Sequence, residues 1–258
     1  MKNTIISELE QLELTLEIKI LLAVESGSRA WGFASKDSDW DVRFIYIHKP
    51  EWYLSIDEKK DNFDVMLPGG LDFAGWELRK ALNLFRKSNP PLLEWLRSPM
   101  IYLEQFSAAQ RMRTLTAQYF NPKSCMYHYL SMANGNFKNY LQHDLVRTKK
   151  YFYVLRPIFA CRWIEKYNEM APMEFKVLMD NLDLTGNVQS EIEKLLARKK
   201  DGEEFDKEPQ NKVLNDYLAQ EIAHFENFIK ALNPEKKPLT AKLNLLFRDA
   251  LDEAWVRE

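Results

Sequence analysis

Short apolar runs alternate with helical periodicities over the first hundred residues. Apolar residues recur at helical spacing through residues 4–16, which predicts an amphipathic helix. The apolar run 18–24 has the length of a buried strand, and residues 39–47 alternate as a second strand would. The other elements expected here are a short helix at 28–33, a connecting segment at 51–60, strands at 62–67 and 71–73, helices at 75–87 and 90–98, and a last strand at 100–103.

From about residue 108 onward the pattern is helical, and it contains no convincing strand. Breaks are expected near Asn134-Gly135, Ala171-Pro172, Thr185-Gly186 and Asn233-Pro234, and the charged stretch 198–207 is expected to be a solvated loop or helix end. The change of pattern predicts two domains, at residues 1–105 and 106–258. The expected fold class is therefore α/β (α+β), a short mixed sheet with flanking helices followed by an all-α domain.

Charge and composition narrow the classes of protein that need considering. The formal net charge is −2, so the chain as a whole does not attract nucleic acid, and any such affinity must come from a local patch. Its two cysteines form no CxxC motif, which excludes a disulfide framework and an ordinary zinc site. No signal peptide and no apolar run of about 20 residues is present, so we expect a soluble cytoplasmic protein with no membrane partner.

The candidate chemistry lies where the first expected strand ends and the second begins. Gly27-Ser28 follows the first strand, where a glycine and a hydroxyl beside a helix start suit an anion. Asp39 and Asp41 are two residues apart in an extended segment, so both side chains are expected to leave the same face. Two such carboxylates repel each other unless they share a cation, and Mg²⁺ is the natural partner when phosphate oxygens complete its shell. An anion cradle and a metal are the parts that phosphoryl-type transfer requires.

This arrangement resembles a known superfamily. Gly27-Ser28 followed by Asp39-x-Asp41 is similar to the motif of DNA polymerase beta-type nucleotidyltransferases. The longer string GSRAWGFASKDSDWDVRFIY, residues 27–46, resembles a bacterial and phage group of predicted nucleotidyltransferases that includes the RNA repair-associated polymerase beta-like proteins. The segments LDFAGWELRKAL (71–82), SNPPLLEWL (88–96) and KKYFYVLRP (149–157) also look like that group, so the resemblance extends from about residue 24 to residue 172.

The resemblance implies a polymerase beta-like fold, with a helical domain completing a nucleotide cleft, and a third carboxylate on a later strand. Asp72 fits that role best, and Asp64 is the rival. The implied metal ligands and catalytic residues are thus Asp39, Asp41 and Asp72. The expected nucleotide-binding residues are Gly27, Ser28, Arg29, Ser38, Arg43, Lys149, Lys150 and Arg156.

The implied reaction moves a nucleotide from an NTP to an acceptor hydroxyl with Mg²⁺ or Mn²⁺ and releases pyrophosphate. An RNA end is one candidate acceptor, and a small molecule or a protein is another. The competing hypothesis is a non-catalytic module that senses nucleotide within a repair or toxin–antitoxin-type complex.

Several of these side chains have an ordinary structural alternative. Ser28 can simply cap a helix, and Arg43 can pair with a nearby acid instead of pointing to substrate phosphate. Lys149 and Arg156 are seven residues apart, so we expect them on one helix face, where they either reach water or contact the triphosphate. Trp31 fits core packing better than base stacking, and the same holds for Trp40.

Other enzyme classes have little support. The four histidines are scattered without a serine or cysteine partner at diagnostic spacing, so the sequence gives no sign of a hydrolase triad. No glycine-rich loop ends in Lys-Ser or Lys-Thr, which argues against a P-loop NTPase.

Overall fold

The computed structural model describes residues 1–200, 207–233 and 239–255, and these form two compact units. The first unit comprises Met1–Ala30, Asp39–Tyr119 and the described part of Lys237–Glu258; the second comprises Trp31–Ser38 and the described part of Phe120–Lys236. The predicted boundary at 105/106 differs from this division. Residues 106–119 belong to the first unit, the C-terminal helix returns to it, and a short segment near residue 35 belongs to the second.

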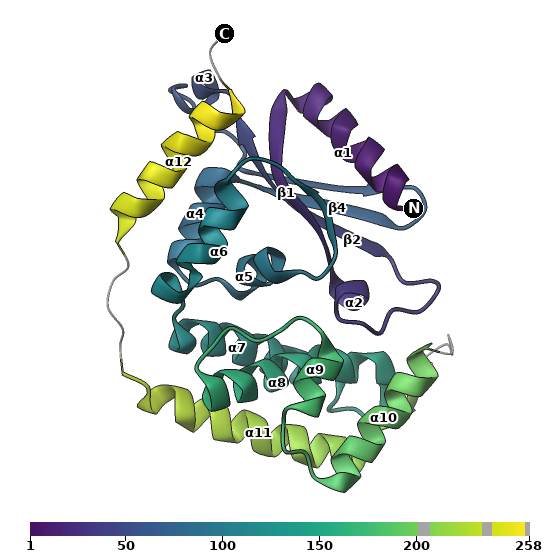
Figure 1. Ribbon diagram of the computed structural model, residues 1–258. Helices are drawn as coiled ribbons and strands as arrows, with labels where there is room; N and C mark the ends of the chain where they lie inside the picture. Colours follow the sequence, from purple (N-terminus) through teal and green to yellow (C-terminus); the bar gives the residue numbers. More distant parts are fainter. Residues whose placement is uncertain (201–206, 234–238, 256–258) are drawn as a thin grey trace. The chain divides into compact units, whose positions relative to one another are not determined.

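A five-stranded mixed sheet organises the first unit (Figure 1). The strands lie in the order β3-β4-β2-β1-β5. Their bounds are β1 (Ile18–Ser26), β2 (Trp40–His48), β3 (Asn62–Leu67), β4 (Leu71–Glu77) and β5 (Ile101–Glu104). Only the β2–β4 pair is parallel, which makes the sheet mixed. All five strands were expected from the hydrophobic pattern, and the predicted α+β fold class is confirmed.

Helices cover both faces of this sheet. Helix α1 (Lys2–Leu16) packs its buried Ile5 and Leu9 on one face, against a core that includes Phe44 and Phe73. The opposite side carries helices α4 (Leu78–Arg86), α5 (Pro90–Arg97), α6 (Ala108–Tyr119) and α12 (Thr240–Ala254). The unit also contains two short helices, α2 (Gly27–Ala30) and α3 (Pro50–Tyr53). Because side chains alternate along a strand, the residues of β2 that do not face α1 are aimed at the other side.

The helix expected at 75–87 begins three residues later than predicted. Residues 75–77 continue β4, which pairs in parallel with β2 as far as Tyr46 and Glu77. Gly75 is needed there because a Cβ at this position would lie 2.3 Å from the ring of Phe44. The Glu77 carboxylate then accepts hydrogen bonds from the backbone N–H groups of Arg79 and Lys80 and starts α4 as its N-cap.

The second unit is mainly helical. It contains α7 (Pro122–Tyr140), α8 (Phe152–Tyr167), α9 (Phe175–Asp180), α10 (Gly186–Lys200), α11 (Lys212–Ala231) and the 3-10 turn η1 (Thr148–Tyr151). Its core includes Phe152, Phe159 and Phe175, whose rings lie against one another. The break predicted at Asn134-Gly135 is wrong, since α7 runs through it; the buried side chains Tyr129, Ala133 and Phe137 outweigh the local cost of one glycine.

A two-stranded ribbon corrects two further predictions for this unit. Strands β6 (Leu145–Arg147) and β7 (Lys207–Pro209) pair antiparallel, although no strand was expected after residue 108. Three residues are too few to produce a recognisable alternation. The ribbon also means that residues 145–156 are not one helix, so the placement of Lys149 and Arg156 on one helix face is wrong. Part of the charged stretch 198–207 ends α10, and residues 201–206 lie outside the described part.

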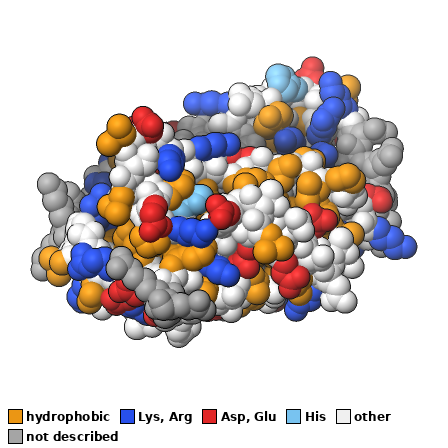
Figure 2. All heavy atoms as spheres, turned by 90° about the horizontal axis from the view of Figure 1, so that it is seen from above, with side chains coloured by type: hydrophobic (Ala, Val, Ile, Leu, Met, Phe, Trp, Pro, Cys, Tyr) orange, Lys and Arg blue, Asp and Glu red, His pale blue; other side chains and the backbone are white. Residues whose placement is uncertain are grey.

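No helix in the described part of the chain combines the length and apolarity that a membrane span requires. On the face drawn in Figure 2, basic and acidic side chains are interspersed with hydrophobic ones. This mixture matches the near-zero net charge of the whole chain.

Candidate active site

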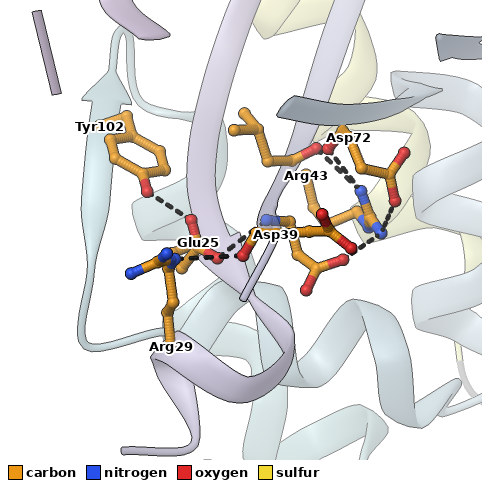
Figure 3. A network of polar contacts seen from close by, with 8 residues as sticks. Glu25, Arg29, Asp39, Arg43, Asp72 and Tyr102 are labelled. Atoms are coloured by element: carbon orange, nitrogen blue, oxygen red, sulfur yellow. Dashed lines mark hydrogen bonds and ion pairs between the residues drawn. The ribbon is translucent and has the colours of Figure 1, made fainter. Parts of the chain in front are cut away.

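The parallel pairing of β2 and β4 brings two predicted metal ligands to the same level of the sheet. Asp41 and Asp72 are direct partners in the register, so their side chains share a face. Both contact one nitrogen of Arg43: its Nη2 lies 3.0 Å from Asp41 Oδ1 and 2.7 Å from Asp72 Oδ2 (Figure 3). Arg43 Nη1 also donates to the carbonyl oxygen of Asp72 at 2.9 Å. The two carboxylates therefore converge on a single cation position.

Gly27 lies directly against Asp41 and has a conformation that favours glycine. Its φ is +61°, a left-handed value that disfavours other residues, and a Cβ there would be 2.0 Å from Asp41 Oδ2. From the sequence, Gly27 was expected to let a phosphate approach the backbone. In the structure, the space beside its Cα is taken by the carboxylate instead.

Asp39 has the same kind of neighbour. It comes one residue before β2, and its Oδ1 would be 2.9 Å from a Cβ on Gly70, whose φ is +71°. The N–H of Trp40 donates to the Gly70 carbonyl at 2.8 Å, which holds the start of β2 against the β3–β4 turn. The β3–β4 turn thus fixes the backbone around Asp39.

A buried glutamate holds the backbone of Asp41. Glu25 is fully buried, and its Oε1 accepts the backbone N–H of Asp41 at 2.9 Å. Its Oε2 accepts a hydrogen bond from the hydroxyl of Tyr102 on β5 (Figure 3). Burial raises the pKa of the Glu25 carboxyl, against the lowering effect of these hydrogen bonds. Through these hydrogen bonds Glu25 of β1 connects β5 to β2 at the position of Asp41.

Arg29 fixes the other side of Asp39. Its Nε donates to the Asp39 carbonyl oxygen at 3.1 Å, and its guanidinium lies 3.7 Å from the centre of the Trp40 ring. Stacking on an aromatic face suits a planar guanidinium. Arg29, predicted to bind nucleotide, here holds the Asp39–Trp40 backbone in place (Figure 3).

The electrostatics of Asp41 reflect a crowded group of acids. Burial is the largest cause that raises the pKa of the Asp41 carboxyl, and Arg43 lowers it. The negative charges of Asp72 and Asp39 raise it further. Both predicted partners of Asp41 are thus near enough to affect its protonation, and a cation among them would be favourable.

The donor set fits a hard divalent ion in type. Within the described residues no group of three His, Cys, Asp or Glu is already arranged around a metal position. Two aspartates nevertheless share the cation Arg43, and carboxylate oxygens are what Mg²⁺ and Mn²⁺ prefer. A metal held by Asp41 and Asp72 would have to take the place of that guanidinium nitrogen.

Three other predicted residues can be placed in the structure. Among the described residues the Ser28 side chain has no hydrogen-bond partner, so its hydroxyl is available beside Gly27. Ser38 closes a local turn, where its Oγ accepts the Ser35 N–H at 3.0 Å. Asp64, the rival third carboxylate, is exposed, pairs with Ala74 in the β-ladder and accepts from Asn62 Nδ2 at 2.6 Å. Of the two candidates, Asp72 is the one next to Asp41.

The remaining predicted nucleotide-binding residues belong to the second unit. Lys149 and Lys150 lie in η1, and Arg156 lies in α8. Arg156 is almost fully buried, with its guanidinium 4.7 Å from the centre of the Trp31 ring. Trp31 therefore packs on a cation within this unit.

Sequence reasoning did not identify Glu25, Tyr102 or Gly70. Glu25 directly precedes the Ser-Gly-Ser turn, so a charged residue at the end of an apolar run was the only local signal. Tyr102 lies 77 positions from Glu25 in the chain, and no short motif connects them.

Comparisons with known proteins show the family to which the chain belongs. A family model described as RlaP, RNA repair pathway DNA polymerase beta family, matches residues 1–249. The chain is 49% identical over 255 residues to "Uncharacterized protein YcgL" of Bacillus subtilis (strain 168), covering 99% of this chain and 98% of that protein. A crystal structure of a nucleotidyltransferase-like protein from Exiguobacterium sibiricum 255-15 matches 86% of this chain and 74% of its own, at 10% identity and a TM-score of 0.33, a likeness too weak to support any argument. Since the family model covers nearly the whole sequence, this chain belongs to the RNA repair pathway DNA polymerase beta family.

Proposed function

We propose that this protein is a metal-dependent nucleotidyltransferase that moves a nucleotide from an NTP to an acceptor hydroxyl. The observation that supports it most is the convergence of Asp41 and Asp72 on one cation, with Asp39 close enough to raise the pKa of Asp41. Membership of a polymerase beta family also supports nucleotidyl transfer. The bound substrate would be an NTP, with Mg²⁺ or Mn²⁺.

In this proposal the chain's own residues position the reactants. Asp39, Asp41 and Asp72 would hold the metal, which when bound supplies charge neutralisation at the phosphates. The acceptor oxygen forms a bond to the α-phosphorus while the bond from that phosphorus to the bridging oxygen breaks, and pyrophosphate leaves. Asp72 takes the hydroxyl proton. Ser28 donates its hydroxyl to phosphate oxygens, and Glu25 holds the Asp41 backbone in position.

Arg43 has a specific part in this scheme. Its guanidinium neutralises Asp41 and Asp72, which would otherwise face each other as like charges. With metal and NTP bound, Arg43 would leave this position and could pair with a phosphate. The carboxylates are therefore expected to bind metal weakly until the nucleotide is present.

The same pairing favours a second candidate function. A site whose cation position is filled by arginine suits a module that binds nucleotide without turnover. Such a sensor would bind NTP and leave the nucleotide intact.

One experiment separates the two functions. Purified protein is incubated with α-labelled NTPs, Mg²⁺ or Mn²⁺ and a panel of acceptors, beside the Asp39→Ala/Asp41→Ala variant. We expect label transfer that falls by at least a hundredfold in the variant, as loss of the metal ligands requires. Asp64→Ala serves as the matched control and should retain transfer. Nucleotide binding without transfer to any acceptor would instead establish the sensor.

A further inference from the structure

A cluster of cations and aromatic rings lies within the second unit. We call it the basic–aromatic cluster. Its cations are Arg147, Lys149, Lys150, Lys199 and Lys207, and its rings are Trp31, Phe33, Tyr140 and Tyr153. They come from β6, β7, η1, the ends of α7 and α10, the start of α8, and the segment that begins at Trp31. These elements are distant in sequence, so the fold itself gathers the cluster.

The β6–β7 ribbon places two of these cations against each other. Arg147 and Lys207 are direct cross-strand partners, and both are exposed. Like charges at opposite positions of a ladder are destabilising. Lys149 follows two residues after Arg147, and its charge lowers the pKa of both Lys150 and Lys199, after the larger effect of burial. The five cations are therefore near neighbours.

None of the five cations forms an ion pair with an acid in the described part of the chain. Elsewhere in this unit cations are paired with acids, as Arg162 is with Glu221 and Lys166 with Asp183. Residues 201–206 include four acids in the sequence and lie outside the described part. Among the described residues these like charges lie together without counter-charges, an arrangement that lowers stability and favours the binding of an anion.

Aromatic rings lie among these cations. The Nζ of Lys150 is 4.2 Å from the centre of the Tyr140 ring and 4.7 Å from that of Tyr153. Both rings are substantially exposed, at 42% and 44%. Tyr153 in turn lies edge-on to Trp31 at 6.2 Å, and Lys199 lies 5.6 Å from the Phe33 ring. Exposed rings beside cations are the arrangement on which unpaired bases stack while phosphates are neutralised.

We infer that the basic–aromatic cluster binds single-stranded nucleic acid. The cations contact successive phosphates, and Tyr140 and Tyr153 stack on bases. Five cations exceed what the phosphates of one metal-bound NTP require, whereas a strand offers one charge per nucleotide. The role of this nucleic acid as the acceptor of the transferred nucleotide rests on the proposed function. Its binding to the cluster can be measured without any transfer reaction.

The test measures binding of a short fluorescein-labelled single-stranded RNA by anisotropy over a range of KCl concentrations. The full-length protein is compared with Arg147→Gln/Lys149→Gln/Lys207→Gln and with Tyr140→Ala/Tyr153→Ala. Lys230→Gln, an exposed cation at the end of α11, is the matched control. Melting temperatures show whether each variant is folded.

We expect the triple variant to bind at least tenfold more weakly. The slope of log affinity against log salt should shrink by about 2, since each lost phosphate contact on a single strand contributes about 0.7. The tyrosine variant should lose about tenfold for RNA and keep its affinity for inorganic polyphosphate, because a base-free chain offers nothing to stack on. Equal binding of single-stranded DNA would also support the inference, and the ratio of the two affinities measures recognition of the 2′-hydroxyl.

Three outcomes would overturn it. The first is unchanged RNA affinity in the folded triple variant. The second is a loss of ATP·Mg²⁺ affinity with RNA affinity intact, which would make the cluster part of a nucleotide site. The third is tighter binding of duplex than of single strands. The Asp39→Ala/Asp41→Ala protein should still bind RNA, so a failure of the transferase proposal is seen separately from a failure of this one.

Discussion

At the scale of single residues, the site depends on how closely Asp41 approaches the backbone of Gly27. The left-handed φ, and the 2.0 Å that would separate a Cβ at this position from the carboxylate, exclude any side chain at this glycine. Gly69 shares a left-handed φ of +82°, but nothing lies within 4 Å of the corresponding position. Substituting Gly27 and Gly69 in turn therefore distinguishes the effect of backbone strain, present at both, from displacement of Asp41, expected only at Gly27.

Gly27→Ala should reduce the proposed transfer activity by at least a hundredfold. It should also destabilise the protein by about 1–3 kcal/mol, since alanine is strained at positive φ and must push Asp41 aside. Gly69→Ala should cost stability of a similar order while leaving activity nearly intact. The measurements are initial rates with labelled NTP and denaturant unfolding. Equal activity losses in both variants would show that strain alone, and not the position of Asp41, explains the effect.

If Asp41 and Asp72 hold metal as proposed, Arg43, which pairs with both, would compete with it. Removing it in Arg43→Ala should therefore tighten Mn²⁺ and Mg²⁺ binding to the nucleotide-free protein about tenfold, or on the order of 1.4 kcal/mol. Isothermal calorimetry of the metal alone measures this. Arg113→Ala is the control, because that guanidinium pairs with Glu104 instead. Unchanged or weaker metal binding in Arg43→Ala would mean that the arginine is not a competitor.

At the scale of elements, Glu77 connects the end of β4 to the start of α4. Its carboxylate caps the helix and accepts the Tyr53 hydroxyl at 2.5 Å, and Arg79 faces it from the helix itself. Burial is the main cause that raises the pKa of the Glu77 carboxyl. A carboxyl whose pKa is raised on folding favours the folded state when protonated, and this stabilisation is lost as pH rises.

Glu77→Gln should remove that pH dependence. The stability of the wild type relative to the variant should fall as pH increases above 4.5, the ordinary value for glutamate, through the raised folded-state value. Glu77→Ala should cost about 1 kcal/mol or more at any pH, because the cap itself is lost. Urea unfolding at several pH values tests both, with Glu51→Gln as an exposed control. A constant difference between wild type and Glu77→Gln across pH would contradict the assignment.

At the scale of the whole molecule, the C-terminal helix α12 belongs to the unit that contains the sheet. Leu243, Leu246 and Ala250 are buried, and α12 contacts α4 and α6. Asp249 forms an ion pair with Arg111 at 2.8 Å. The carboxylate of Glu253 accepts from the backbone N–H of Ser107 at 2.8 Å. The first unit is therefore built from both ends of the chain.

Leu246→Ala should consequently destabilise the unit with the candidate site by about 2–5 kcal/mol, the usual cost of emptying a buried leucine position. Leu245→Ala, at a neighbouring position that is 51% exposed, should change stability by less than about 1 kcal/mol. Denaturant unfolding followed by tryptophan fluorescence compares the two. Similar effects from both substitutions would argue against this packing of α12.

The succession of strands and helices up to residue 104, and the two aspartates after a Gly-Ser turn, could be predicted from the sequence alone. Periodicity and turn residues are local properties, so they can be recognised in the sequence alone. The sequence did not reveal the β6–β7 ribbon, because three-residue strands leave no pattern, or the continuation of α7 through Gly135, because burial of its neighbours outweighs one glycine.

Which side chains meet at the candidate site followed from the three-dimensional fold. The parallel register put Asp72, and not Asp64, next to Asp41; the fold set Arg43 between two acids and brought Tyr102 to Glu25. The same holds for the cations of β6, β7 and α10. Such encounters depend on strand register and on packing between distant segments, and neither is written in the spacing of residues along one stretch of chain.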